Sequence, residues 1–215
     1  MTAPMPIVAN VVEMRKPRKR QVRARLSYLD NDQIEKFLRA AKEYGPREYS
    51  MFLTALAHGM RASETAGLRL TDLNFKNGQI HVARLKGSLD SVQGFLQIKG
   101  NSLFDEARAL RAWLAVRERD AQDFVYNSQK SCRLHRVTIF RLFQQIARAA
   151  GLPETLQHPH VLKHSAAMLM VKAGMSAFHV KQHLGHKSFD STLQYVAVSD
   201  SDASASFASA CAVAF

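Results

Sequence analysis

The stretch that decides the fold is residues 160–195, which read HVLKHSAAMLMVKAGMSAFHVKQHLGHKSFDSTLQY. The apolar spacing predicts short helices, and His160 and Lys163, three residues apart, share one helical face. Gly185 permits a turn that brings His186 beside them, and Tyr195 follows nine residues later. The residues that we expect to face the core instead are Leu162, Ala166 and Leu169. The stretch therefore predicts a cationic pocket that holds one aromatic hydroxyl.

A second group of candidate residues lies about a hundred residues earlier, in residues 58–72, HGMRASETAGLRLTD. Arg61 is expected just beyond an apolar helix, at the start of the next one. Its guanidinium can hold two phosphate oxygens, Lys163 can add a point charge, and imidazoles can exchange protons. The pattern indicates phosphate chemistry. The alternative is that Arg61 caps the preceding helix by binding its carbonyl groups.

Histidines crowd this part of the chain, since six of the nine lie at positions 158, 160, 164, 179, 183 and 186. A zinc site is the first alternative, because His179 and His183 have the spacing of the helical zinc-protease motif. That motif requires glutamate directly after its first histidine, where Val180 stands, and neither cysteine nor aspartate supplies a further ligand nearby. We therefore expect no zinc site. His179 and His183 are interpreted as part of a solvated or packing face.

The remaining sequence predicts an α+β domain. One helix begins after Asp30, with Gln33 at the third position, and ends at Gly45–Pro46; a second covers about 47–58. Asn77–Gly78 predicts a hairpin between short strands, with further strands to about Ile98. Helices resume near Trp113 and again near residue 140. The residues expected on the buried face of that last helix are Val137, Phe140, Phe143, Ile146 and Ala147.

The amino-acid composition limits the classes of protein to which this chain can belong. The 215 residues carry a net charge of +12, which favours a polyanionic partner such as nucleic acid, and at 47% hydrophobic residues the chain can bury a core. Two cysteines, Cys132 and Cys211, are too few for a disulfide framework. No apolar run is long enough to span a membrane, and no secretory signal is present. We therefore expect a cytoplasmic protein.

Residues 1–25 form a separate segment, which we call the basic arm. It contains one acidic residue, Glu13, and about half of the net positive charge of the chain. Three prolines and the absence of apolar periodicity predict a flexible arm that binds DNA phosphates, the alternative being a solvated tail without a partner. Its basic residues are Arg15, Lys16, Arg18, Lys19, Arg20, Arg23 and Arg25.

These motifs resemble those of the tyrosine recombinases, the phage-integrase family of DNA strand-exchange enzymes. Residues 58–72 resemble the family's first arginine box, and residues 160–195 its second, with Leu-Gly-His followed by a tyrosine nine positions later. Arg84-Leu-Lys86-Gly87 resembles the hairpin that carries the family's lysine. The first box, the hairpin and the second box in the right order are far more specific than any one of them. The resemblance covers about residues 26–198 and implies a mainly helical catalytic domain with a small antiparallel β-sheet.

The resemblance implies a metal-free transesterification. Tyr195 would attack the scissile phosphate and form a 3′-phosphotyrosyl intermediate, with Arg61, Lys163 and His186 stabilising the developing charge. Lys86 would be the general acid for the leaving 5′-oxygen, and His160 the general base. Arg84 and Lys99 are alternatives to Lys86, because both lie in the same region of strands. The resemblance implies no cofactor, and His158 and His164 would be structural or DNA-flanking residues.

The sequence departs from the family in two ways. Lysine stands at position 163, where the family carries arginine, and it lacks the bidentate fork. Only the basic arm precedes the catalytic part, where most members have a further helical domain, so the layout resembles the fimbrial phase-variation recombinases. The resemblance implies a synaptic homotetramer on double-stranded DNA and action at the nucleoid. We also expect residues 199–215 to dock on a neighbouring protomer, and an accessory bending or directionality protein to take part. The alternatives are a DNA-binding accessory protein that has lost catalysis, or a type IB topoisomerase.

Overall fold

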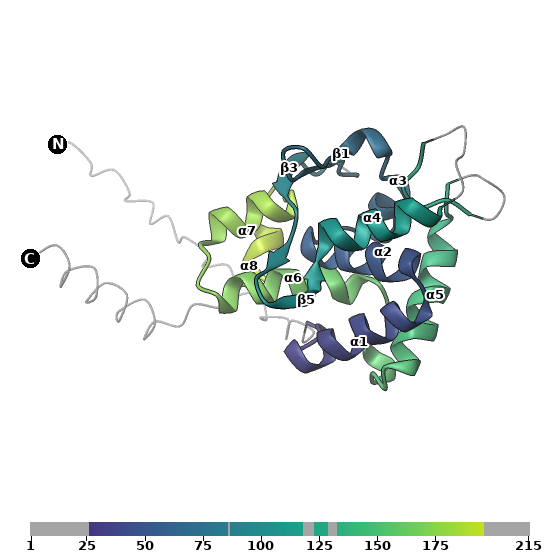
Figure 1. Cartoon of the computed structure of the whole chain (residues 1–215). Coiled ribbons are helices and arrows are strands. Elements are labelled where there is room, and N and C mark those ends of the chain that lie inside the picture. Colours follow the sequence, from purple (N-terminus) through teal and green to yellow (C-terminus); the bar gives the residue numbers. More distant parts are fainter. Residues whose placement is uncertain (1–25, 86, 118–122, 129–132, 196–215) are drawn as a thin grey trace, which may run out of the picture.

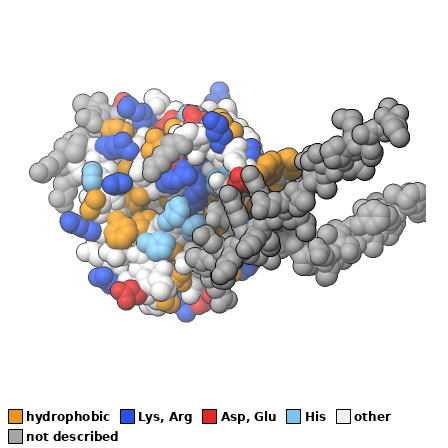
Figure 2. Space-filling view, turned by 180° about the vertical axis from the view of Figure 1, so that it is seen from behind, with side chains coloured by type: hydrophobic (Ala, Val, Ile, Leu, Met, Phe, Trp, Pro, Cys, Tyr) orange, Lys and Arg blue, Asp and Glu red, His pale blue; other side chains and the backbone are white. Residues whose placement is uncertain are grey.

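In the computed structural model of this chain the described residues are 26–85, 87–117, 123–128 and 133–195; all other residues are grey in Figures 1 and 2. Within them the structure is mainly helical. The helices are α1 (Asn31–Tyr44), α2 (Pro46–Ala57), α3 (Ala62–Gly67), α4 (Glu106–Val116), α5 (Arg136–Ala149), α6 (His160–Lys172), α7 (Ala177–Leu184) and α8 (Asp190–Leu193). The strands are β1 (Leu73–Asn74), β2 (Gln79–Val82), β3 (Ser91–Gly94), β4 (Gln97–Ile98) and β5 (Asn101–Asp105).

The first helix begins and ends where its sequence predicts. The Asp30 side chain accepts a hydrogen bond from the Gln33 backbone N–H at 2.9 Å, and the Gln33 side chain accepts one from the Asp30 N–H at 3.0 Å. This reciprocal capping box satisfies two helix N-terminal donors. Gly45 ends α1, and Pro46 opens α2 at a position where no backbone N–H is needed.

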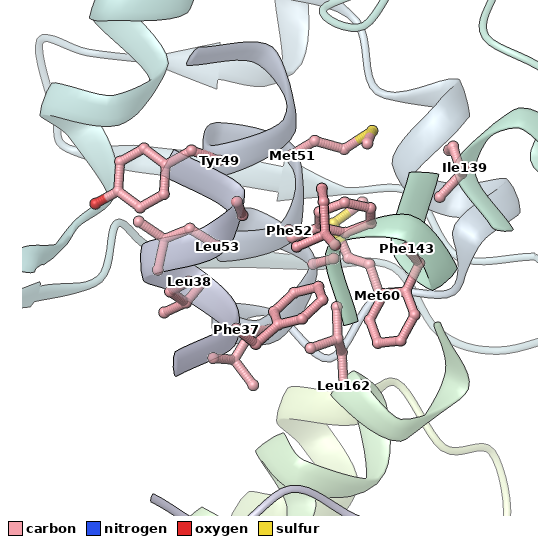
Figure 3. Close-up of a cluster of buried hydrophobic side chains, with 14 of the residues drawn as sticks. Phe37, Leu38, Tyr49, Met51, Phe52, Leu53, Met60, Ile139, Phe143 and Leu162 are labelled. Atoms are coloured by element: carbon pink, nitrogen blue, oxygen red, sulfur yellow. The ribbon is translucent and has the colours of Figure 1, made fainter. Parts of the chain in front are cut away.

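The hydrophobic core lies where α1, α2 and α5 meet (Figures 1 and 3). Phe37 of α1 lies 5.4 Å from the Phe52 ring of α2 and 4.6 Å from the Phe143 ring of α5, and the two latter rings are 5.5 Å apart. Burying three aromatic side chains in one cluster contributes several kcal/mol through the hydrophobic effect. The core therefore provides a rigid base for the elements that surround it.

Two small antiparallel sheets follow α3. β1 and β2 pair through the predicted turn at Asn77–Gly78, with Leu73 opposite Ile80, and β3 pairs with the other edge of β2. The strands continue past the predicted limit at Ile98, because β4 and β5 form a second hairpin that ends at Asp105. The first sheet places the loop after β2 against the N-terminus of α3.

Our prediction of the buried faces of two helices was wrong in part. Val137 and Phe140 of α5 are exposed, because the helix turns Ile139, Leu142 and Phe143 to the core instead. The set with Val137 and Phe140 and the set with Ile139 and Leu142 both fit the period of a helix, so only tertiary packing determines which set is buried. Leu169 of α6 is also exposed, although Leu162 and Ala166 are buried as expected.

Helices α7 and α8 lie beside α6 (Figure 1), and a second, small hydrophobic cluster forms between them, next to the main core that α6 also contacts. Val180 and Leu184 of α7 pack with Ala167 of α6 and with Tyr195, which follows α8. Gly185 ends α7 in the left-handed conformation, with φ of 67°. Among the described residues no helix is both long enough and apolar enough to cross a membrane.

Candidate active site

Residues from distant segments meet at one place on the surface. Figure 2 shows Lys and Arg side chains beside histidines near the middle of one face. The elements that supply the candidate residues are the start of α3, the loop after β2, helix α6, the turn after α7 and the end of α8. The fold thus joins the two boxes that the sequence keeps about a hundred residues apart.

Arg61 precedes α3 and is fixed by Glu64. The Arg61 guanidinium donates from Nη1 to Oε1 of Glu64 at 2.8 Å, and its backbone N–H donates to Oε2 at 2.9 Å. The Arg61 side chain keeps 31% of its surface exposed, whereas that of Glu64 is fully buried. Burial raises the pKa of Glu64, but the hydrogen bonds from Arg61 and nearby positive charges outweigh it and leave that pKa below its usual value. Glu64 is thus an anion that orients Arg61 and leaves part of the guanidinium free for a ligand.

Arg84, which follows β2, ties three segments together. Its Nη2 donates to the carbonyls of His58 and His183, both at 2.7 Å. Its Nη1 donates to Glu64 Oε2 at 3.2 Å and to the Gly59 carbonyl at 3.1 Å. The side chain is fully buried, so it cannot reach DNA and acts on the site through its neighbours. The sequence suggested Arg84 only as an alternative to Lys86. The partners of the Arg84 side chain lie 20 to 99 residues away in the sequence, so no local pattern could identify them.

Lys163 lies on the inner side of α6. It is 2% exposed, and its Nζ donates to the Leu184 carbonyl at 3.1 Å. Burial, with smaller contributions from the positive charges of Arg84 and Arg61, lowers the pKa of Lys163 to about 7. Lys163 therefore changes its charge near neutral pH, which an arginine at the same position would not do.

His186 follows the turn at Gly185 and is 6% exposed. Its Nδ1 lies 2.9 Å from Oγ1 of Thr192, and its ring stacks on that of Tyr195 with centroids 6.4 Å apart. Burial, with smaller contributions from the charges of Lys163 and Arg61, lowers the pKa of His186 to about 4. The ring is consequently neutral at pH 7, and Thr192 fixes its orientation.

Tyr195 is 5% exposed, and its hydroxyl contacts His164. The distance from Tyr195 Oη to His164 Nδ1 is 2.8 Å. Burial raises the pKa of Tyr195 to about 12, although the charge of Arg61 acts in the opposite direction. His160 is exposed, and its ring lies 4.5 Å from that of His164 in an edge-to-face arrangement. The structure thus brings His164, which the sequence did not identify as a catalytic candidate, to the candidate nucleophile.

The remaining predicted residues lie outside the described part of the chain. These are Lys86 and the basic residues of the arm, Arg15, Lys16, Arg18, Lys19, Arg20, Arg23 and Arg25. Both flanks of position 86 do contact the site. The Leu85 N–H donates to Glu64 Oε1 at 3.3 Å, and the Leu89 N–H donates to the Gly185 carbonyl at 3.0 Å. In the described ranges no group of three or more His, Cys, Asp or Glu residues could hold a metal ion.

Comparison with known proteins identifies relatives over most of the chain. Residues 27–202 match the model of the phage integrase family. The type 1 fimbriae regulatory protein FimE of Escherichia coli K12 is 29% identical over 176 residues, which cover 79% of this chain and 85% of FimE. The tyrosine recombinase XerA of Thermococcus onnurineus is 26% identical over 79% of this chain and 57% of XerA.

Solved structures share the fold. A crystal structure of XerA recombinase matches with a TM-score of 0.69 at 25% identity, over 90% of this chain and 66% of that one. A XerH recombinase bound to its difH substrate matches with a TM-score of 0.71 at 21% identity, over 84% of this chain and 53% of that one. This chain therefore spans between half and two thirds of the solved proteins.

Proposed function

The chain belongs to the phage integrase family and is a site-specific DNA recombinase, and we propose that Tyr195 is its nucleophile. The observation that carries this proposal is the position of the phenol. Its ring stacks on His186, its hydroxyl contacts His164, and the charge of Arg61 acts on it. A phosphate that binds Arg61 would approach the hydroxyl of Tyr195.

In the proposed reaction Oη of Tyr195 attacks the scissile phosphorus and displaces the 5′-oxygen. The products are a 3′-phosphotyrosyl bond and a free 5′-hydroxyl. Because the energy of the broken phosphodiester bond is kept in this intermediate, attack by another 5′-hydroxyl rejoins the DNA, and no cofactor is required. Residue roles are carried over from the family motif at the positions that match it.

Three side chains are proposed to stabilise the negative charge that develops on the phosphorane oxygens. Arg61 has a partly exposed guanidinium that Glu64 holds in place, and Lys163 and His186 lie close enough to Arg61 for its charge to lower the pKa of each. Fixed donors of this kind are each worth on the order of 3 kcal/mol in a transition state.

Two proton transfers complete the scheme. We propose Lys86 as the general acid that protonates the leaving 5′-oxygen, and the contacts of Leu85 and Leu89 with the site support a position near Arg61 for this loop. For the general base we propose His160 together with His164, because their rings are in contact and His164 touches the phenol. A phenol of high pKa needs such a base at neutral pH.

The proposed partner is double-stranded DNA. The XerH structure contains its difH substrate, and a lambda integrase dimer of the same fold is bound to a core site. We propose that the catalytic part covers residues 26–198, that the basic arm binds phosphates, and that residues 199–215 dock on a neighbouring protomer of a synaptic homotetramer. An accessory bending or directionality protein, and action at the nucleoid, complete this proposal.

One observation favours a second candidate, a DNA-binding accessory protein with impaired catalysis. Lys163 is buried and only partly charged at neutral pH, so it stabilises a phosphorane less than arginine would. An active recombinase and an accessory protein would both bind DNA, but only the recombinase would form a covalent bond with it.

A covalent-trapping experiment tests the proposal. The purified chain is incubated with sheared genomic DNA from the cell that carries its gene, denatured, and recovered with any DNA that stays attached. We expect wild-type protein to retain one DNA sequence through a bond that Tyr195→Phe abolishes. DNA binding without an adduct would favour the accessory protein, and adducts at unrelated sequences would favour a topoisomerase. An adduct that persists in Tyr195→Phe would refute the assignment of the nucleophile.

A further inference from the structure

We infer that His164 is a further catalytic residue of this recombinase, the group that takes the proton directly from Tyr195 as the phenolic oxygen attacks phosphorus. The inference rests on the proposed function, because it concerns the same tyrosine. It separates the two imidazoles of the proposed base: His164 accepts the proton, and His160 acts on His164 as a positioning residue.

The geometry of the contact is that of a general base. Oη of Tyr195 and Nδ1 of His164 are 2.8 Å apart, inside the range of about 2.6–3.2 Å for direct proton transfer. The ring centroids are 5.7 Å apart at an angle of 52°, so the hydroxyl meets the ring nitrogen and the rings do not stack. His160 contacts the ring of His164 from the preceding turn of α6.

The protonation states fix the direction of this hydrogen bond. Burial, with smaller contributions from His160, His158 and Lys163, lowers the pKa of His164 to about 4. The phenol has a pKa of about 12, so at neutral pH it keeps its proton and donates it to the unprotonated Nδ1. In the DNA-free enzyme, transfer of the proton from Tyr195 to His164 is therefore strongly unfavourable, and the phenol stays protonated.

Bound DNA changes this balance. Lys163, whose positive charge helps to lower the pKa of His164, also favours binding of a phosphodiester, and the negative charge of that phosphodiester opposes the effect of Lys163 on the imidazole. Other groups that face the pair are His186, stacked on the phenol, and Arg61, whose charge favours the phenolate. As Oη shares an electron pair with phosphorus, its proton becomes acidic and can move to His164.

The step balances without a further reactant. The O–H bond of Tyr195 breaks and an N–H bond forms at Nδ1 of His164, while the Oη–P bond forms. The P–O5′ bond breaks, and its electron pair stays on the 5′-oxygen, which takes a proton from the proposed acid Lys86. Religation runs the same steps in reverse, and His164 returns the proton to Oη.

The test uses single-turnover cleavage of a nicked duplex that contains the sequence recovered by covalent trapping. His164→Gln keeps a hydrogen-bond acceptor for the phenol but cannot take its proton. We expect cleavage to slow by about a hundredfold or more, the range of general-base catalysis, with DNA affinity unchanged. The matched control is His179→Ala, which removes an exposed histidine of α7 and leaves the rate as in wild type.

Two chemical substitutions distinguish a base from an orienting group. A fluorinated tyrosine at position 195, whose phenol is far more acidic, needs less help from a base, so the deficit of His164→Gln shrinks at least about tenfold. A 5′-bridging sulfur in the substrate needs no protonation to leave; it restores cleavage in Lys86→Ala but not in His164→Gln. A loss that the fluorinated tyrosine leaves unchanged, a rescue of His164→Gln by sulfur, or near-normal cleavage by His164→Gln would each overturn the inference.

The same experiment separates failure of the inference from failure of the proposed function. If the wild-type chain forms no adduct, or if Tyr195→Phe still forms one, the proposed function fails and the role of His164 falls with it. If adduct formation depends on Tyr195 but not on His164, the proposed function stands and only the inference is wrong.

Discussion

Lys163 carries from a buried position the charge that arginine carries in the family motif. Its Nζ donates to the Leu184 carbonyl, directly before the turn that presents His186. We expect Lys163→Ala to abolish cleavage, because it removes a charge and leaves a buried carbonyl unpaired. Lys163→Arg retains or improves cleavage. The measurement is the rate of adduct formation on the nicked duplex, and an alanine variant with a normal rate would remove Lys163 from the site.

The low pKa of Lys163 gives a second prediction at the residue scale. With a pKa of about 7 in the free protein, Lys163 is mostly neutral at pH 8. A bound phosphate favours the charged ammonium and raises that pKa, so DNA binding at pH 8 should take up roughly one proton per protomer. Calorimetry in buffers of different ionisation enthalpy measures this uptake. Lys163→Arg serves as the control, since arginine is charged in both states, and equal uptake by both proteins would contradict the prediction.

Thr192 acts on the site through His186. Both side chains are buried, and Oγ1 of Thr192 holds Nδ1 of His186 at 2.9 Å. Thr192→Val keeps the shape of the side chain but removes this partner, so the imidazole loses its fixed orientation. We expect adduct formation to slow by about tenfold, with little change in DNA affinity. Thr192→Ser keeps the hydroxyl and should form the adduct at the wild-type rate. Equal rates for the valine and serine variants would show that the hydrogen bond to His186 does not contribute to cleavage.

At the scale of elements, Gly185 joins the second arginine box to the hairpin loop. It has φ of 67°, and a Cβ added there would lie 2.6 Å from the Leu89 carbonyl oxygen. Gly185→Ala must therefore move the loop, and we expect it to lower the free energy of unfolding by more than about 2 kcal/mol and to abolish cleavage. Gly174 is the matched control.

Gly174 has φ of 76°, but an added Cβ there meets open space. Gly174→Ala should thus lower the free energy of unfolding by only about 1–2 kcal/mol, the cost of the left-handed conformation, and leave cleavage intact. Denaturant unfolding and the cleavage assay measure both effects. Equal losses of stability and of cleavage in Gly185→Ala and Gly174→Ala would show that the close contact of Leu89 with Gly185 contributes to neither.

Local signals predicted the elements well and their tertiary partners poorly. The capping box at Asp30 and the turn at Asn77–Gly78 are complete within a few residues, so the sequence alone identifies them. The exposure of Val137 could not be predicted, because two apolar faces of α5 compete and only packing against α1 and α3 selects one. The contact between His164 and Tyr195 spans 31 residues, and the turns between α6 and α8 create it.

At the scale of the whole molecule, Arg84 explains how distant segments hold one geometry. Its guanidinium binds carbonyls at the end of α2 and of α7 and the carboxylate that orients Arg61. Movement of any one segment would leave a buried charge or carbonyl unpaired, which costs several kcal/mol. The candidate site is consequently built as one unit from the first box, the hairpin loop and the second box.

The net charge of +12 leads to the last prediction, which concerns the basic arm. If residues 1–25 bind phosphates, deleting them weakens DNA binding. It also reduces the slope of a plot of log affinity against log salt concentration, by roughly 0.9 for each phosphate that the arm neutralises. Cleavage of DNA that is already bound should be unchanged. An arm with the same residues in scrambled order is the matched control, and it should retain the steep dependence because binding to phosphates reads no sequence. Equal salt slopes for the full and shortened chains would mean that the arm does not touch the DNA.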